Sequence, residues 1–167
     1  MSATIAADTN FLASQLEGRA EVAGLLSAVH RAHLSLLREK IPARLRIGNS
    51  NDLEIYLRTM LQHESTEQIH VLYLNTKNEL LHEFVSQGAL DAATLYVRDV
   101  LYHGMQIGAA GLILIHNHPS GDPTPSAADK DMTRKLALAC KLVDMSLHDH
   151  LVVARSGVIS FRREGIL

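Results

Sequence analysis

The chain has 167 residues, of which 47% are hydrophobic, and its formal net charge at pH 7 is −2. This length suits one main domain with a small helical appendage, and the hydrophobic share is enough to build a core. The slight negative charge argues against a protein that coats nucleic acid through bulk electrostatics. The single cysteine, Cys140, excludes an internal disulfide, and its apolar helical surroundings predict that it is a buried small hydrophobe.

The first eight residues have neither a basic region nor a sustained apolar core, so they do not resemble a secretory signal. No segment contains the ~20 apolar residues that a membrane-spanning helix needs. We therefore expect a soluble, cytoplasmic protein that makes no contact with a membrane.

Residues 21–38 predict an amphipathic helix. Its apolar side is expected to consist of Val22, Leu25, Leu26, Val29, Leu34 and Leu37. Between positions 30 and 46, one acidic residue faces five basic ones, which are Arg31, Arg38, Lys40, Arg44 and Arg46. Such a run is most often a solvated helix face. Because no aromatic stacking residues accompany it, contact with DNA phosphates is kept only as an alternative.

Helices and strands alternate along the rest of the chain. We expect helices after Ser50, at residues 95–107 and from Ser126 to about Val143, and strands at residues 69–74, 80–86, 111–116, 147–154 and 158–161. Residues 76–78 would connect the first two strands as a hairpin. This alternation implies a layered α/β fold.

The most informative segment, residues 116–129, predicts a catalytic metal site. The apolar run at residues 109–115 predicts a fully buried strand, at whose end His116 and His118 share a face. Ser126 and Asp129 fall on one face of the first turn of the next helix. The loop between them is rich in Pro and Gly and can fold the helix start back to the strand end. Two imidazoles and one carboxylate would then converge.

Three protein ligands suit a catalytic zinc ion, because a catalytic site keeps a fourth position for water whereas a structural site closes with four ligands. The pKa of that water falls to about 7, which makes hydroxide available at neutral pH. A general base is expected nearby. His116, His118 and Asp129 fit this pattern with one zinc ion per chain, and manganese, iron or cobalt could use the same ligands.

Each half of the motif also has an ordinary structural interpretation. Ser126 and Asp129 have the spacing of a plain helix N-cap. The His-x-His spacing recurs at His148 and His150 without a following Ser-x-x-Asp. It is the combination of the two halves, joined by the Pro- and Gly-rich loop, that favours the metal site.

Other hydrolytic sites fit the sequence less well. A zinc deaminase would need a Pro-Cys-x-x-Cys segment, and the chain has one cysteine. The helical His-Glu-x-x-His motif of other metalloproteases is absent. A serine hydrolase built on Ser120 would lack the Gly-x-Ser-x-Gly elbow.

Residues 116–129 read HNHPSGDPTPSAAD, and this motif resembles that of the RadC family, a bacterial branch of the JAB/MPN domains that carry the JAMM metalloprotease motif. The resemblance extends in the family's order to LYLNTKNEL at 72–80, GAL at 88–90, Arg98-Asp99 and DHLVV at 149–153. It covers roughly residues 45–167.

The resemblance implies a three-layer α/β JAB/MPN domain of the cytidine-deaminase-like kind, with a mixed sheet, at residues 45–167. A short helical region at residues 1–44 would precede it. Full-length RadC proteins begin with a region resembling helix-hairpin-helix DNA-binding modules, but this chain has no such Gly-rich hairpin, so we expect the region to be shortened. Val97 and Ala89 replace a proline and a threonine usual in the family, which affects a helix entry and a turn rather than the metal motif.

The resemblance also implies roles for the site residues. Zinc would be held by His116, His118 and Asp129, and Ser126 would help to stabilise the oxyanion of a tetrahedral intermediate. An upstream glutamate would hydrogen-bond the attacking water and pass its proton to the leaving amine.

Two glutamates compete for this last role. Glu67 is the candidate, because it precedes the strand-like run at 69–74 and lies 49 residues before His116, a separation similar to the family's. Glu83, in the second predicted strand, is the competitor, since it aligns with an acidic position common in RadC sequences. The ordinary interpretation of either is a solvated surface carboxylate.

Two functions from different classes remain. The first is a zinc metallohydrolase, a metallopeptidase or isopeptidase that uses metal-activated water, with an association with DNA repair. The alternative is a non-catalytic binding module of DNA repair or recombination in which the metal stabilises the fold. A nuclease is less well supported, because many metal-dependent nucleases use two ions held by several carboxylates. The sequence leaves the substrate and the oligomeric state open.

Overall fold

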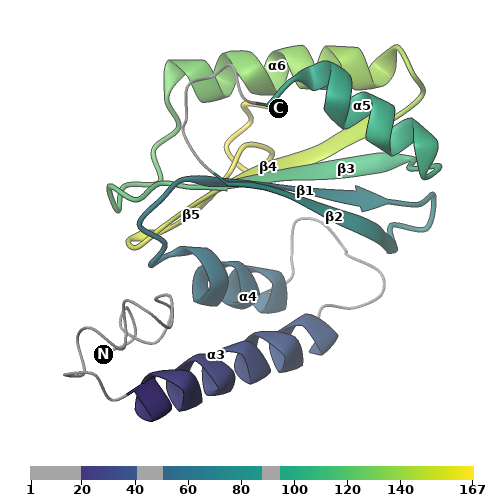
Figure 1. Cartoon of the computed structure of the whole chain (residues 1–167). Helices are drawn as coiled ribbons and strands as arrows, with labels where there is room; N and C mark the ends of the chain where they lie inside the picture. The colour runs from purple at the N-terminus through teal and green to yellow at the C-terminus, as the bar shows by residue number, and fades with distance from the viewer. Residues whose placement is uncertain (1–19, 41–50, 88–94) are drawn as a thin grey trace.

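The computed structural model describes residues 20–40, 51–87 and 95–167 (Figure 1). Its centre is a five-stranded sheet in the order β2-β1-β3-β4-β5. The strands are β1 (Gln68–Leu74), β2 (Leu80–Gln87), β3 (Gly111–Asn117), β4 (Ser146–Ala154) and β5 (Gly157–Ser160). The β3–β4 pair is parallel and the other three pairs are antiparallel, so the predicted α/β fold with a mixed sheet is confirmed.

Helices cover both faces of the sheet and complete three layers (Figure 1). The helices α5 (Val97–Gln106) and α6 (Ala127–Lys141) lie on one face. The helix α4 (Asn51–Leu61) lies on the other face, with α3 (Ala20–Lys40) beyond it. The observed bounds differ from the predicted ones by at most two residues at either end.

The alternation of side chains along the strands divides the core into two halves. One half packs around α4 and includes Leu72, Leu74, Ile113 and Ile115. The other half packs under α5 and α6 and includes Val71, Tyr73, Leu112, Leu114, Leu136 and Cys140. Since residues 112, 114 and 116 share a face of β3, His116 belongs to the α5/α6 face. The predicted burial of Cys140 is confirmed.

The hairpin between β1 and β2 forms around Asn75. The Oδ1 atom of Asn75 accepts hydrogen bonds from the backbone N–H groups of Lys77 at 2.8 Å and Glu79 at 3.0 Å. Asn78 has a φ of 61°, a left-handed conformation that asparagine tolerates better than most residues. The predicted hairpin at residues 76–78 is therefore confirmed.

The predicted apolar face of the first helix is partly wrong. Val22, Leu25 and Val29 are exposed, whereas Ala23 and Ser27 are buried. Ala23 and Ser27 thus lie on the covered side of α3, and Val22, Leu25 and Val29 lie on its exposed side. The side chains of Leu34 and Leu37 are outside the part of the chain that the structure describes. A hydrophobic pattern alone did not identify which side is covered.

Several expectations concern the part of the chain outside the described residues. The domain boundary expected at residues 44/45 lies there, as do residues 1–19, Arg44 and Arg46. Contact of the basic run with DNA therefore stays a prediction. None of the described helices is both long and apolar enough to cross a membrane.

Packing of α6 on the sheet gives a testable stability difference. Leu136 is fully buried, whereas Leu138 on the same helix is 64% exposed. Replacing Leu136 by Ala should lower the free energy of unfolding by about 2–5 kcal/mol, because it removes buried methyl groups and leaves a cavity. Leu138→Ala should change it by less than about 0.5 kcal/mol. Urea denaturation would measure both, and equal losses would contradict this orientation of α6.

Candidate metal centre

The end of β3 positions two of the candidate residues. His116 is the penultimate residue of β3, and Asn117, which is 1% exposed, is the last. The Oδ1 atom of Asn117 accepts a hydrogen bond from the backbone N–H of Gln68 at 2.7 Å, and its Nδ2 donates to the carbonyl of Thr66 at 3.1 Å. These bonds tie the segment before β1 to the end of β3. Glu67, which lies between the two bonded residues, is thereby held beside His116.

The loop after β3 fixes His118. The backbone N–H of His118 donates to the carbonyl of Val153 in β4 at 2.8 Å, and its ring Nδ1 lies 2.8 Å from the carbonyl of Asp122. Because a carbonyl only accepts, Nδ1 must carry the proton of this bond. Gly121 turns the loop with a φ of 91°, which favours glycine. The Nε2 atom of His118 therefore faces the centre of the site.

The start of α6 orients Asp129. Ser126 is the N-cap residue, and it forms a capping box with Asp129. The Asp129 N–H donates to Ser126 Oγ at 3.1 Å, while the Ser126 N–H and hydroxyl donate to Asp129 Oδ2 at 2.7 and 2.6 Å. The same carboxylate lies 3.4 Å from His116 Nε2 and 3.6 Å from His118 Nε2. The cap interpretation of this pair is therefore confirmed, and the cap also aims Asp129 at the two histidines.

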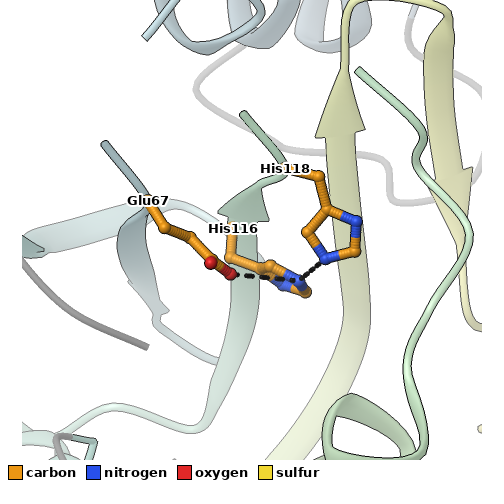
Figure 2. Close-up of side chains that lie close together, drawn as sticks. All are labelled: Glu67, His116 and His118. Atoms are coloured by element: carbon orange, nitrogen blue, oxygen red, sulfur yellow. Dashed lines mark hydrogen bonds and ion pairs between the residues drawn. The ribbon is translucent and has the colours of Figure 1, made fainter. Parts of the chain in front are cut away.

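Four side chains meet at the edge of the α5/α6 face. Figure 2 shows Glu67, His116 and His118 pointing toward one another, and each offers a ligand atom within 4.8 Å of the others. The Nε2 atoms of His116 and His118 are 2.9 Å apart, and Glu67 Oε1 lies 3.9 Å from His116 Nε2. Two facing ring nitrogens at this distance need a proton or a cation between them, because their lone pairs repel.

The spacing of these groups is close to that of a zinc site. Ligand atoms at the usual bond lengths of about 2.0–2.2 Å in a tetrahedral site are about 3.3–3.6 Å apart. His116 Nε2 lies 3.4 Å from Asp129 Oδ1, His118 Nε2 lies 3.6 Å from the other oxygen, Oδ2, and the two Nε2 atoms are 2.9 Å apart, which is closer than a zinc ion would hold them. The donor set of two imidazoles and one carboxylate also suits zinc. By donor type, His116, His118 and Asp129 therefore fit a three-ligand site, while Glu67, His116 and His118 are the group whose ligand atoms all lie within 4.8 Å of one another.

The ionisable groups are pushed in different directions. Burial lowers the pKa of His116 to about 4, although Asp129 opposes this shift. The imidazole ring is therefore uncharged at pH 7 and can bind a metal ion through a nitrogen lone pair. The interaction with Asp129 raises the pKa of His118. Burial alone would raise the pKa of Asp129, but its hydrogen bonds with His118 and Ser126 and the nearby His116 outweigh that effect and hold its pKa well below the usual range.

Glu67 behaves in the opposite way to Asp129. Burial raises its pKa to about 7, and the negative charge of Asp129 adds to this shift while His118 opposes it. Glu67 thus exchanges a proton near neutral pH, whereas Asp129 stays ionised. One carboxyl group has the properties of a permanent anionic ligand, and the other has those of a proton carrier.

Glu83, the competitor for the role of base, lies on the other face of the sheet. It pairs in register with Leu72 of β1, whose side chain packs around α4. Its Oε1 atom is 3.0 Å from Nδ1 of the buried His70. The sheet therefore separates Glu83 from His116.

Three polar residues at the site were not singled out for it from the sequence. They are Asn117, Thr133 and His150, all of which are buried. His150 Nε2 lies 2.7 Å from His116 Nδ1, and His150 Nδ1 lies 2.6 Å from Thr133 Oγ1. The one sequence signal was the His-x-His spacing that includes His150, which on its own indicates no partner.

Comparisons with known proteins show the family of the chain. The family model described as the RadC-like JAB domain matches residues 47–166. A UPF0758 protein of Ruegeria pomeroyi is 39% identical over 165 residues, which cover 93% of this chain and 73% of that protein. A UPF0758 protein of Rhodobacter capsulatus is 40% identical over 143 residues, which cover 85% of this chain and 67% of that protein.

A third relative is a UPF0758 protein of Symbiobacterium thermophilum, which is 39% identical over 154 residues. That match covers 90% of this chain and 64% of the relative. The chain thus spans roughly two thirds to three quarters of the curated relatives it matches. The family model covers most of the layered domain and all four residues of the candidate metal centre, so the chain belongs to the RadC-like JAB domain family.

Proposed function

We propose that this JAB domain is a zinc-dependent hydrolase of peptide or isopeptide bonds. The observation that supports the proposal is the convergence of His116, His118 and the ionised Asp129, with Glu67 at the edge of the group. Such a site combines three ligands of the kind that catalytic zinc prefers with a proton carrier whose pKa is about 7.

The roles of the residues follow from their surroundings. A zinc ion held by His116, His118 and Asp129 would supply a Lewis acid and lower the pKa of a bound water to about 7. Glu67 would accept the proton of the attacking water and return it to the leaving amine, since a pKa near neutrality suits both transfers. Ser126, whose hydroxyl now donates to Asp129, would stabilise a developing oxyanion by turning that single proton toward it.

Asp129 is better placed than Glu67 to be the third zinc ligand. Both Asp129 oxygens lie within 3.6 Å of a histidine Nε2, whereas the Glu67 oxygen is 3.9 Å from His116. The capping box also fixes Asp129 before any ion binds. This preorganisation favours Asp129 as a ligand and leaves Glu67 free to move a proton.

Metal content tests the site itself. Protein purified without a His-tag should contain about one zinc ion per chain, as measured by plasma mass spectrometry. His118→Ala should lose it, because two protein ligands remain in place of three. His33→Ala, which changes an exposed histidine of α3, should keep it. The absence of zinc from both wild type and the His33 variant, even after incubation with the metal, would overturn the proposal.

Glu67→Gln separates the base from the ligands. This variant should keep zinc and lose about 10²–10⁴-fold in kcat, because the amide cannot carry the proton. Glu83→Gln should keep both the zinc ion and the wild-type kcat, since Glu83 lies on the opposite face of the sheet. Hydrolysis of a peptide and isopeptide substrate panel would be assayed at equal zinc loading. Loss of zinc from the Glu67 variant would instead make Glu67 a ligand.

Ser126→Gly tests the hydroxyl apart from the helix cap. Glycine at an N-cap costs only a few tenths of a kcal/mol, so the melting temperature should change little. The kcat should fall about 10²–10³-fold if the hydroxyl stabilises the oxyanion. Zinc content and melting temperature measured on the same sample would serve as controls. An unchanged kcat would limit Ser126 to its capping role.

A further inference from the structure

A chain of buried hydrogen bonds leads from His116 into the core beneath α6. His116 Nδ1 lies 2.7 Å from His150 Nε2, and His150 Nδ1 lies 2.6 Å from Thr133 Oγ1. Thr133 Oγ1 lies 2.6 Å from the backbone carbonyl of Asp129. The three residues are at most 3% exposed, so water does not compete for these bonds. The chain begins at one predicted metal ligand and ends on the backbone of another.

The acceptor at the end of this chain of hydrogen bonds determines which atom donates in each of them. The Asp129 carbonyl can only accept, so the Thr133 hydroxyl donates its single proton to it. Thr133 Oγ1 must then accept from His150 Nδ1–H. A neutral His150 has no second ring proton, so its Nε2 accepts from His116 Nδ1–H. The proton of His116 is thereby fixed on Nδ1, and Nε2 presents a lone pair.

Burial keeps His150 neutral in this chain. The ring is 1% exposed, and charging a buried imidazole is costly without a paired anion. Phe161 stacks on it, with ring centroids 4.4 Å apart and an angle of 28° between the planes. A phenyl ring neither donates nor accepts a conventional hydrogen bond, so His116 and Thr133 are the polar partners of the His150 ring among the described residues.

Asp149 holds this stack in place. Its Oδ2 atom accepts from the hydroxyl of Ser160 at 2.6 Å, and its Oδ1 accepts from the backbone N–H groups of His150 and Arg162 at 2.8 and 3.0 Å. The segment on either side of Phe161 is therefore anchored to the residue beside His150. This arrangement fixes the plane of the His150 ring and hence its reach to His116.

We infer that His150 and Thr133 are positioning residues that preset His116 as a metal ligand through Nε2. The inference rests on the proposed zinc site and goes beyond it, because it assigns a task to two residues that touch neither the ion nor the substrate. His118 reaches the same tautomer by a direct bond from Nδ1 to the Asp122 carbonyl. The tautomer of His118 is thus set by a loop carbonyl, whereas that of His116 is set by a relay, the chain of hydrogen bonds through the core.

A pair of substitutions at Thr133 isolates the relay. Thr133→Val keeps the shape and removes the hydroxyl, whereas Thr133→Ser keeps the hydroxyl. Without the hydroxyl, a proton on Nδ1 of His150 has no acceptor, so the ring is more stable with its proton on Nε2, where His116 Nδ1 can accept it. His116 must then carry its own proton on Nε2, the nitrogen that should bind the metal. Zinc affinity, measured by competition with a chelator, should fall by about 10–100-fold in Thr133→Val. Thr133→Ser should stay within about threefold of wild type.

Nitrogen-15 NMR of metal-free wild type tests the same inference without a variant. The ring shifts of His116 should show a protonated Nδ1 and an unprotonated Nε2. A proton on Nε2 would overturn the inference, and so would folded Thr133→Val protein that binds zinc as tightly as wild type. If the relay behaves as expected but no peptide or isopeptide is cleaved, the relay stands and the proposed hydrolase fails. If wild type binds no zinc, the NMR result alone decides the tautomer.

Discussion

The pairing of β3 with both of its neighbours is the constraint on which the candidate site depends. β3 runs antiparallel to β1 and parallel to β4, so its end lies beside the beginning of β1 and near the end of β4. Glu67 directly precedes β1, and His150 lies on β4, opposite Leu114 of β3. Three segments far apart in the sequence meet there because β3 is buried at every position and has partners on both edges.

The sequence predicted most of the local structure because the relevant signals are local. The strand, the turn-rich loop and the helix start around His116, Ser126 and Asp129 follow one another within 14 residues, so their meeting could be inferred without tertiary information. The choice between Glu67 and Glu83 was different, because it depended on the face of the sheet. The covered side of α3 was also missed, since a helix with apolar residues on several sides does not specify which of them a neighbour covers.

The polar residues around the site could not be predicted for a related reason. Asn117 bonds to a segment 49–51 residues away, and His150 bonds to a histidine 34 residues away. Such partners have no fixed spacing, and each residue type is common on protein surfaces. Burial in the folded chain is what makes these bonds decisive, because an unpaired polar group in the core is costly.

Asp129 uses all of its polar groups at one point of the fold. Its N–H donates to the cap serine, its carboxylate accepts from that serine and faces both histidines, and its carbonyl accepts from Thr133. The first turn of α6 and an ion bound beside it would therefore share a residue. By thermodynamic linkage, the ion would stabilise that turn by the same free energy with which the ordered turn strengthens ion binding. A chelator would then do more than empty the site, because it would also loosen the beginning of the helix.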